Sequence, residues 1–219
     1  MLEVLRYKRY RSMPWRNGLG TTLEIAREPA QGEHFAWRLS LAGLDRDSSF
    51  SAYPGYRRAL VLVDGSVLRL RFQGHGSALL GATKRGTRFE GAWRTSCALP
   101  DGPCTDLSLI VRAGSSAHGK CILREPAVLE IDRERQLDAP AGVHVALFVL
   151  EGSVGASATN GARQRRLHVH DTLLLRPGPR RILTLRRIGQ PVAKLALLRW
   201  RAGAAARHQQ PVSGASLRI

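Results

Sequence analysis

The chain has 219 residues, enough for one large β domain or two small ones, and its 43% apolar residues exclude a disordered protein. Residues 1–15 are charged throughout, and no uncharged apolar run reaches the length of a membrane span, so the sequence predicts a cytoplasmic protein without membrane contact. Three cysteines without C-x-x-C spacing argue against a disulfide framework and indicate free, mostly buried thiols.

The formal net charge is +17, and 30 of the 34 basic residues are arginines. Residues 163–201 hold ten arginines and Lys194 against one acid, Asp171, and such a patch could attract a polyanion. The arginine pairs lie within strand patterns, however, without interleaved aromatic residues on which bases could stack. We therefore expect a solvated basic sheet face rather than a nucleic-acid-binding surface.

Short apolar runs and alternating polar and apolar residues recur along the chain, with little helical periodicity. They predict strands at 36–44, 58–72, 105–114, 127–133, 144–154, 171–177, 180–187 and 191–201. Eight short strands with turn residues between them favour an antiparallel sandwich or barrel.

An internal repeat sharpens this prediction. The segment ALVLVDGSVLRL at 59–70 resembles ALFVLEGSVGAS at 146–157, since each has an apolar run, an acid and then Gly-Ser-Val. The acid-glycine pairs indicate tight turns between two strands. After the second copy, a polar turn, an apolar strand and a Pro-Gly corner are typical of the second half of a cupin-like barrel.

We therefore predict an all-β bicupin, which is two stacked cupin-like antiparallel β-barrels in one chain. The first barrel is expected over residues 1–120 and the second over 121–201. The remaining tail, 202–219, has little to bury and is expected to be loose.

Common cofactor and catalytic motifs are not found in the sequence. His-Val-His at 168–170 has a local spacing seen in metal sites, but it precedes a turn and has no nearby glutamate, so we expect no metal. No G-x-S-x-G elbow or cysteine-histidine pair provides a nucleophile. Asn-Gly-Leu-Gly at 17–20 lacks the ending of a phosphate loop, and a strand pattern follows it. We predict no cofactor.

Two segments carry polar side chains that could line a pocket. In WRLSLA, Arg38 and Ser40 share one strand face while the opposite face is apolar, so the pair either faces solvent or lines a site for an anion. Arg57 and Arg58 begin another strand on opposite faces, and one of them could point inward as a carboxylate clamp.

Four motifs of the chain occur in the order and approximate spacing of the HutD/Ves family of bacterial bicupins: MPWRNGLGTTLEIA, FAWRLSLAGL, FSAYPGYRRALVLVDG and DGPCTDLSLIVRAG. The chain resembles this family over residues 10–200. The resemblance implies a metal-free bicupin, associated with histidine utilisation, that binds a small carboxylate intermediate and restrains expression of the pathway. No reaction is firmly attached to the family.

The residues and the resemblance together give a set of candidate ligand-binding positions: Trp15, Asn17, Arg38, Ser40, Arg58 and Asp106. Three positions depart from the family pattern: Leu19 replaces a glycine, Arg57 an acid, and Ser108 an asparagine. Because Arg57 stands in place of an acid, we expect Arg58 to lack a local partner. Serine at position 108 removes an amide that could form hydrogen bonds with a ligand, which leaves the identity of the ligand open.

We favour an accessory or regulatory protein of histidine utilisation that binds a small anionic metabolite, such as a urocanate- or formylglutamate-like acid. The alternative is a metal-independent isomerase, lyase or hydrolase acting on a small organic acid, with Asp106 or a histidine as general base. A third hypothesis is a regulator that contacts nucleic acid through 163–201. A homodimer is also left open.

Overall fold

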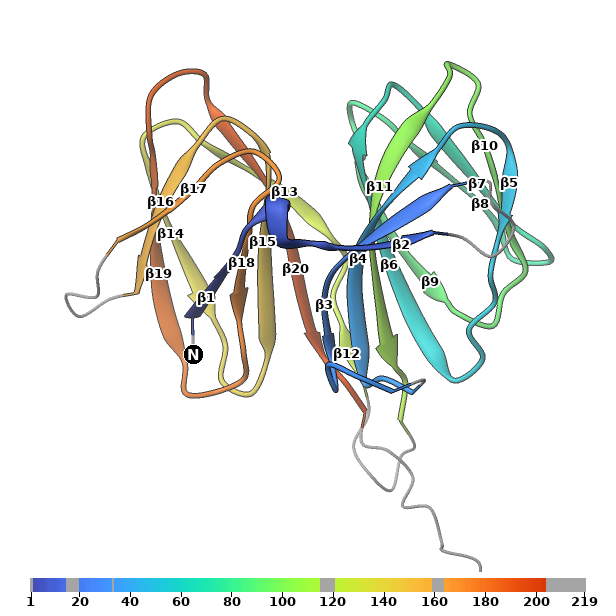
Figure 1. Ribbon diagram of the computed structural model, residues 1–219, viewed down its shortest axis with the longest axis horizontal. Helices are drawn as coiled ribbons and strands as arrows, with labels where there is room; N and C mark the ends of the chain where they lie inside the picture. The colour runs from blue at the N-terminus through green and yellow to red at the C-terminus, as the bar shows by residue number, and fades with distance from the viewer. Residues whose placement is uncertain (1, 15–19, 33, 115–120, 159–163, 204–219) are drawn as a thin grey trace, which may run out of the picture.

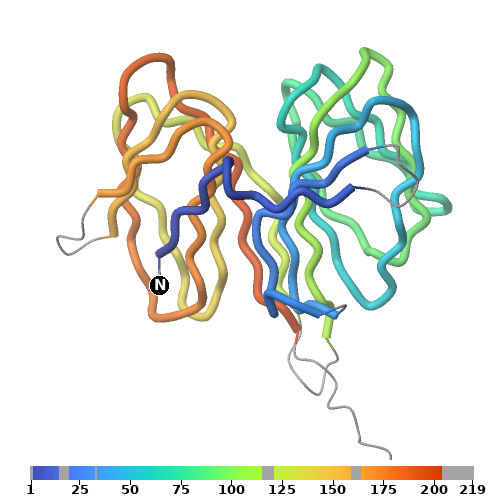
Figure 2. Tube along the Cα trace, viewed as in Figure 1, coloured from blue at the N-terminus to red at the C-terminus, as the bar shows by residue number. Residues whose placement is uncertain are grey.

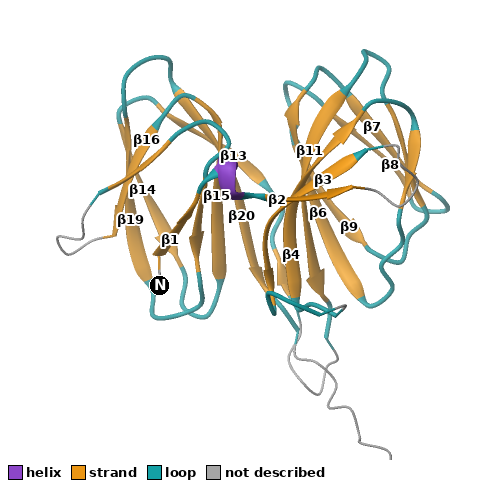
Figure 3. Ribbon diagram, in the orientation of Figure 1, coloured by secondary structure: helices purple, strands orange, loops and turns teal. Residues whose placement is uncertain are grey.

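The computed structural model of the protein describes residues 2–14, 20–32, 34–114, 121–158 and 164–203, which form two antiparallel β-barrels side by side (Figure 1). These residues contain twenty strands, one short 3-10 helix (η1, Tyr7–Arg9) and no α-helix, as Figure 3 shows. None of the described segments is a helix long and apolar enough to cross a membrane. The predicted all-β, two-barrel fold class is confirmed.

The first barrel consists of two sheets. The sheet that faces the second barrel, which we call the first contact sheet, has the order β2-β3-β4-β11-β6-β9, and the outer sheet has the order β5-β10-β7-β8. The strands are β2 (Arg11–Pro14), β3 (Thr21–Glu28), β4 (Trp37–Leu44), β5 (Ser48–Phe50), β6 (Tyr56–Asp64), β7 (Leu68–Phe72), β8 (Gly76–Leu80), β9 (Gly86–Glu90), β10 (Thr95–Ala98) and β11 (Cys104–Arg112).

The second barrel is built in the same way. Its contact sheet has the order β1-β18-β15-β20-β12, with β13 also paired to β20, and its outer sheet has the order β14-β19-β16-β17. The strands are β1 (Leu2–Leu5), β12 (Ile122–Leu123), β13 (Ala127–Ile131), β14 (Glu134–Ala139), β15 (His144–Glu151), β16 (Val154–Ala158), β17 (Arg165–Leu167), β18 (Thr172–Leu175), β19 (Arg181–Arg187) and β20 (Ala193–Arg201).

The amino-terminal strand belongs to the second barrel by its pairing. β1 runs antiparallel to β18, with Leu2 opposite Leu175. Figure 2 shows this blue segment lying against the second barrel before the chain crosses to the first. The predicted first barrel, residues 1–120, therefore includes a strand that pairs in the second barrel. The contact sheet of the second barrel contains residues 2–5 in addition to strands after residue 121.

The two contact sheets pack face to face through a shared hydrophobic core. Trp37, Leu39 and Leu41 of β4 contribute one side of this core, and Phe148 and Trp200 contribute to the other. Strands at such an interface are buried on both faces. This burial explains why ALVLV in β6 and HVALFVL in β15 read as continuous apolar runs instead of alternating ones.

The sequence repeat corresponds to equivalent strand pairs in the two barrels. Asp64-Gly65 joins β6 to β7, and Glu151-Gly152 joins β15 to β16, which confirms both predicted turns. Gly65 and Gly152 have φ angles of 96° and 73°, a region that favours glycine. All eight predicted segments contain strands, although 58–72 and 144–154 each extend across one of these turns.

The interiors of the two barrels differ. Aliphatic side chains such as Leu147, Leu173 and Leu183 form the core of the second barrel. In the first barrel an apolar cluster that includes Leu60, Leu62 and Phe72 fills only part of the interior, and polar side chains line the rest. Of the tail that was expected to be loose, residues 204–219 lie outside the described residues.

Candidate functional site

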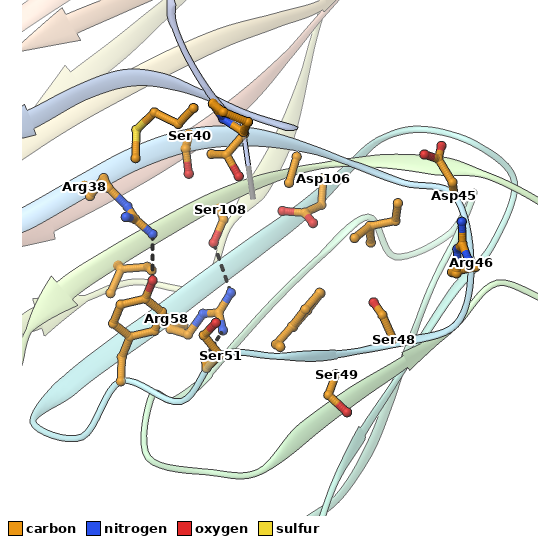
Figure 4. A pocket seen from close by; sticks show the side chains of 18 of the residues that line it. Arg38, Ser40, Asp45, Arg46, Ser48, Ser49, Ser51, Arg58, Asp106 and Ser108 are labelled. Carbon is orange, nitrogen blue, oxygen red and sulfur yellow. Dashed lines mark hydrogen bonds between the residues drawn. The ribbon is translucent and has the colours of Figure 1, made fainter. Parts of the chain in front are cut away.

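A cavity of about 740 Å³ lies in the first barrel, on the inner face of its contact sheet. Strands β4, β6 and β11 form one wall, and the segment from Asp45 to Tyr53, which includes β5, contributes another (Figure 4). The polar and charged side chains of the lining are Thr22, Arg38, Ser40, Asp45, Arg46, Asp47, Ser48, Ser49, Ser51, Tyr53, Arg58, Asp106 and Ser108.

Strand register explains why polar groups gather on this wall. Ile110 of β11 lies between Arg38 of β4 and Arg58 of β6, so two arginines flank one apolar residue at the same level. Ser108, two residues earlier and on the same face, is opposite Ser40. Asp106 follows after two more residues, between Ala42 and Leu62. The alternate residues of β4, Trp37, Leu39 and Leu41, point to the second barrel.

Arg58 is a buried cation without a carboxylate partner among the described residues. Only 7% of the residue is exposed. Its Nη2 donates to Ser108 Oγ at 3.4 Å and its Nη1 to the Ser51 carbonyl at 3.3 Å, and its Nε has no partner in the described part of the chain. The guanidinium lies over the rings of Phe50 and Phe89 at 5.0 and 5.1 Å.

Arg38 provides a second cation on the same wall. Its Nη2 donates to Tyr53 Oη at 2.9 Å, and its guanidinium lies 5.2 Å from the Phe35 ring centroid. Within the described ranges it forms no ion pair, and its buried Nε has no hydrogen-bond partner. Figure 4 shows Arg38 and Arg58 at the same end of the cavity, with Asp45 and Arg46 at the other. Two adjacent guanidinium groups without counter-ions can hold an anion.

Asp106 is the most deeply buried acid of the cavity, with 2% of the residue exposed. Its Oδ1 is buried without a hydrogen-bond partner, and no described residue donates a hydrogen bond to this carboxyl group or forms an ion pair with it. Burial raises the pKa of Asp106 to about 7, although the positive charge of Arg58 acts in the opposite direction. Near neutral pH the carboxyl group therefore exchanges between its acid and its ionised form.

Burial also lowers the pKa of Arg58, while the charge of Asp106 raises it and that of Arg38 lowers it again. An arginine side chain is so basic that it stays protonated in a protein despite such a shift. The deep part of the cavity thus has a fixed positive charge at Arg58 and a variable charge at Asp106.

Four of the six predicted site residues come together in this cavity. Arg38, Ser40, Arg58 and Asp106 all line it, and the alternative in which Arg38 and Ser40 face solvent is wrong. Whether these residues bind a ligand stays a prediction. The other two, Trp15 and Asn17, lie outside the described residues.

The position of Arg57 confirms that the two consecutive arginines point to opposite faces. Its Nε lies 3.1 Å from Glu90 Oε1, and the residue is level with Val111 of the inter-barrel core. Arg58 forms no ion pair within the described residues, although Asp106 lies near enough for its charge to raise the pKa of Arg58.

The sequence patterns assign no role to the residues that orient the two cations. Ser108 and Ser51 accept hydrogen bonds from Arg58, and Tyr53 accepts one from Arg38. Alternation in TDLSLIV could have identified Ser108, because it places this residue on the same face as Asp106. Ser51 and Tyr53 lie between β5 and β6 and follow no periodic pattern that would reveal them.

A buried acid next to this wall was also missed. Glu24 of β3 is opposite Ser40 in the register, and its Oε2 is buried without a hydrogen-bond partner among the described residues. Alternation in TTLEIA could have placed it on the face of Thr22, which lines the cavity.

The histidine pair at 168–170 lies in the second barrel, next to the turn before β18. Asp171 accepts hydrogen bonds there from Arg6 at 2.6 Å and from the backbone of Tyr7 and His168. His170 stacks on Phe148. Among the described residues no group of three or more histidine, cysteine or acidic side chains is placed to hold a metal ion.

The basic stretch 163–201 contributes to strands β17, β18, β19 and β20 of the second barrel. Several of its arginines are exposed, and some form surface ion pairs, such as Arg180 with Asp138 at 2.9 Å and Arg186 with Glu134. The cavity, by contrast, is built from residues between Met13 and Ile110. Nucleic-acid binding and homodimer formation stay untested.

Comparison with known proteins places these observations in a family. The family model described as HutD matches residues 7–192. An uncharacterised 21.2 kDa protein in the hutC 3' region of Pseudomonas putida is 37% identical over 110 residues, which are 50% of this chain and 57% of that protein. Protein Ves of Citrobacter koseri is 38% identical over 69 residues, 30% of this chain and 36% of that protein. The matched region thus spans about half or less of these relatives.

Solved structures extend the likeness over nearly the whole chain. A conserved protein of unknown function from Pseudomonas aeruginosa has a TM-score of 0.80 and 29% identity, covering 92% of this chain and 100% of that one. HutD from Pseudomonas fluorescens has a TM-score of 0.70 and 26% identity, covering 94% and 100%. Oxalate decarboxylase from Lactobacillus farciminis, with a TM-score of 0.65 and 9% identity over 92% and 86%, shows the shared bicupin fold alone.

Proposed function

Because the chain belongs to the HutD family, which is linked by name to histidine utilisation, we propose that it binds a small carboxylate metabolite in the cavity of its first barrel and acts as an accessory or regulatory protein of that pathway. One observation carries the proposal. Two guanidinium groups, Arg38 and Arg58, face one cavity at the same strand level, and neither has a carboxylate partner among the described residues.

A buried guanidinium without a counter-ion is costly, since desolvation of an ion is repaid only by an opposite charge with good geometry. The cation–π contacts and two long hydrogen bonds of Arg58 compensate part of this cost. A ligand carboxylate would supply the missing charge, and the planar fork of arginine suits two parallel hydrogen bonds to its oxygens.

The binding test uses a panel of small acids, namely urocanate, N-formylglutamate, formate and acetate. We expect at least one of them to raise the melting temperature, because ligand at 100 times its dissociation constant adds about 2.7 kcal/mol to the free energy of unfolding. Arg58→Met should abolish this shift. Arg57→Met is the matched control, since it removes the adjacent arginine from the opposite face and should leave binding intact.

Two results would contradict the binding proposal. Either no acid of the panel stabilises the wild-type protein, or Arg58→Met is stabilised as much as wild type. The regulatory role is tested separately by introducing Arg58→Met into cells and measuring transcripts of the histidine-utilisation genes during growth on histidine. A binding-deficient protein should change their level, and an unchanged level would contradict the role.

The enzyme alternative rests on Asp106. A carboxyl group with a pKa of about 7 has the acidity expected of a general acid or base at neutral pH. Turnover of urocanate or N-formylglutamate by the wild-type protein, absent in Asp106→Asn, would favour a metal-independent isomerase, lyase or hydrolase. Binding without turnover would favour the accessory role.

A further inference from the structure

The surroundings of Asp106 set it apart from an ordinary carboxylate. Its neighbours in the strand register are Ala42 and Leu62, neither of which offers a side-chain donor. No described residue donates a hydrogen bond to it, whereas buried ionised carboxylates are normally held by several donors or an ion pair. A neutral carboxylic acid fits such an environment better, but it brings an O–H group that itself needs an acceptor.

The position of Arg58 indicates where that acceptor would lie. The Arg58 guanidinium reaches Ser108 Oγ, and Ser108 and Asp106 are two residues apart on the same face of β11. Two residues of a strand span roughly 7 Å. The Arg58 guanidinium and the Asp106 carboxyl group form no direct hydrogen bond or ion pair, and their positions on one wall allow one carboxylate to accept a hydrogen bond from each of them. Figure 4 shows the side chains of Arg58 and Asp106 facing the same cavity.

We propose that Asp106 binds the ligand as a neutral carboxylic acid, donating a hydrogen bond to an oxygen of the same carboxylate that Arg58 holds, so that each anion enters the site together with one proton. This inference rests on the proposed function and adds to it a regulatory property, which is a dependence of affinity on pH set by Asp106.

Charge balance favours this arrangement over the ionised one. With Asp106 neutral, no second anion lies next to the ligand carboxylate that Arg58 holds. With Asp106 ionised, its carboxylate would face the ligand carboxylate at a buried position where Arg58 is the cation that offsets its charge, and repulsion between the two carboxylates would be strong. The proton taken up comes from solvent and resides on Asp106. The raised pKa of Asp106 in the free protein agrees with this arrangement.

Other titratable groups lie near Asp106, including the buried Glu24 beside the wall, so the test depends on variants of Asp106 itself. Arg38 and Arg46 also line the cavity. Burial raises the pKa of Cys104, on the same face of β11, to about 12, so this thiol stays neutral. The remaining titratable lining residues are Asp45, Asp47 and Tyr53. No histidine is found among the described residues that line the cavity.

Acetate is a suitable probe, because it is a single carboxylate that stays ionised near and above neutral pH. Its dissociation constant is measured by NMR titration at several pH values between about 6 and about 9. In the wild-type protein we expect the affinity to fall about tenfold for each pH unit above about 7, since one proton is taken up with each anion.

Three variants make the test specific. Asp106→Asn keeps a donor without a titratable proton, so acetate should bind with an affinity that no longer depends on pH and that exceeds the wild-type affinity at high pH. Asp106→Ala should also lose the pH dependence, but it should bind more weakly than Asp106→Asn because it has no donor. Asp64→Asn is the control, since Asp64 is exposed at the end of β6 and should keep the wild-type slope.

The outcomes separate the two proposals. If acetate binds through Arg58 but Asp106→Asn keeps the wild-type pH slope, the role of Asp106 is wrong and the proposed binding function stands. If folded Asp106→Asn binds no acetate at any pH while wild type does, Asp106 acts as a carboxylate acceptor, which also overturns the inference. If wild type and Arg58→Met bind acetate and the acid panel equally, the proposed function itself is wrong.

Discussion

Trp37 of β4 and Trp200 of β20 meet edge to face across the boundary between the two barrels, with ring centroids 5.1 Å apart. Both residues have no exposed surface, and they belong to one hydrophobic core that includes residues of both contact sheets. The barrels are therefore joined by a continuous hydrophobic core.

Replacing Trp200 by alanine should destabilise the whole chain. Loss of a fully buried indole leaves a cavity and should lower the free energy of unfolding by about 3–5 kcal/mol, measured by urea denaturation. Trp93→Ala is the comparison, since Trp93 is only partly buried and stacks on the exposed His75. We expect its cost to be clearly smaller, and equal costs would contradict a dominant role of the shared core.

The pH dependence of stability should report the buried carboxyl group of Asp106. Its pKa in the folded protein is about 7, whereas that of an unfolded chain is about 3.9, so the folded state holds a proton that the unfolded state has released. Stability from this group is complete below the unfolded pKa and is lost as the pH rises to about 7, by about 1.4 kcal/mol per unit.

Asp106→Asn removes the titratable group, and with it the loss of stability between about pH 4 and about pH 7. The difference in free energy of unfolding between Asp106→Asn and wild type should therefore grow in favour of the variant from about pH 5 to about pH 7. Asp64→Asn, which changes an exposed acid, should show a constant difference. A difference that is constant for Asp106→Asn as well would contradict the buried, partly neutral acid.

His144 should have the opposite effect on stability. Its ring stacks on Trp200 at a centroid distance of 4.8 Å, and its Nε2 lies 3.6 Å from Glu28 Oε2, which is longer than a hydrogen bond. Burial lowers the pKa of His144, partly offset by Glu28, and Arg176 lowers it further. The unfolded chain therefore takes up a proton first as the pH falls below about 6.5, and stability is lost in that range.

His144→Phe keeps an aromatic ring without a titratable nitrogen, so it should lose less stability than wild type when the pH is lowered from about 7 to about 5. His75→Phe is the matched control, because His75 also stacks on a tryptophan but is exposed. Equal acid sensitivity of His144→Phe and wild type would contradict a neutral buried imidazole.

The turn at Gly65 should tolerate no side chain. Its φ angle is 96°, and an added Cβ would lie 2.5 Å from the Cβ of Cys104. Gly65→Ala therefore combines backbone strain with a steric clash and should cost more than about 2 kcal/mol in thermal or urea unfolding. At Gly55, with a φ of 79° and open space around the added atom, alanine should cost only about 1–2 kcal/mol.

Much of the first-barrel wall could be predicted from alternation alone. In WRLSLA, every second residue is apolar, and this pattern places Arg38 and Ser40 on one face of the strand. Alternation does not indicate which face of β4 lines the interior of the barrel, because the other face is also buried, against the second barrel. That ambiguity between solvent and pocket was resolved only by the packing of the two contact sheets.

Other features depend on contacts between distant parts of the chain. The pairing of β1 with β18 joins residues at opposite ends of the sequence, and nothing in LEVL indicates that partner. Among the described residues, Asp106 receives no hydrogen bond because its neighbours on the adjacent strands are Ala42 and Leu62. Local patterns specify faces and turns, whereas partners across a sheet follow from the topology.

The pairing of β1 with β18 has a consequence for how the protein is assembled during translation. Leu2–Leu5 leave the ribosome long before Thr172–Leu175, the strand on which they lie in the finished protein. Until Thr172–Leu175 have been synthesised, the backbone groups of β1 that pair with β18 have no partner on that strand. A fragment cut after the first barrel would carry this exposed edge permanently and lose the partner of its contact sheet, so it would be prone to associate with other chains.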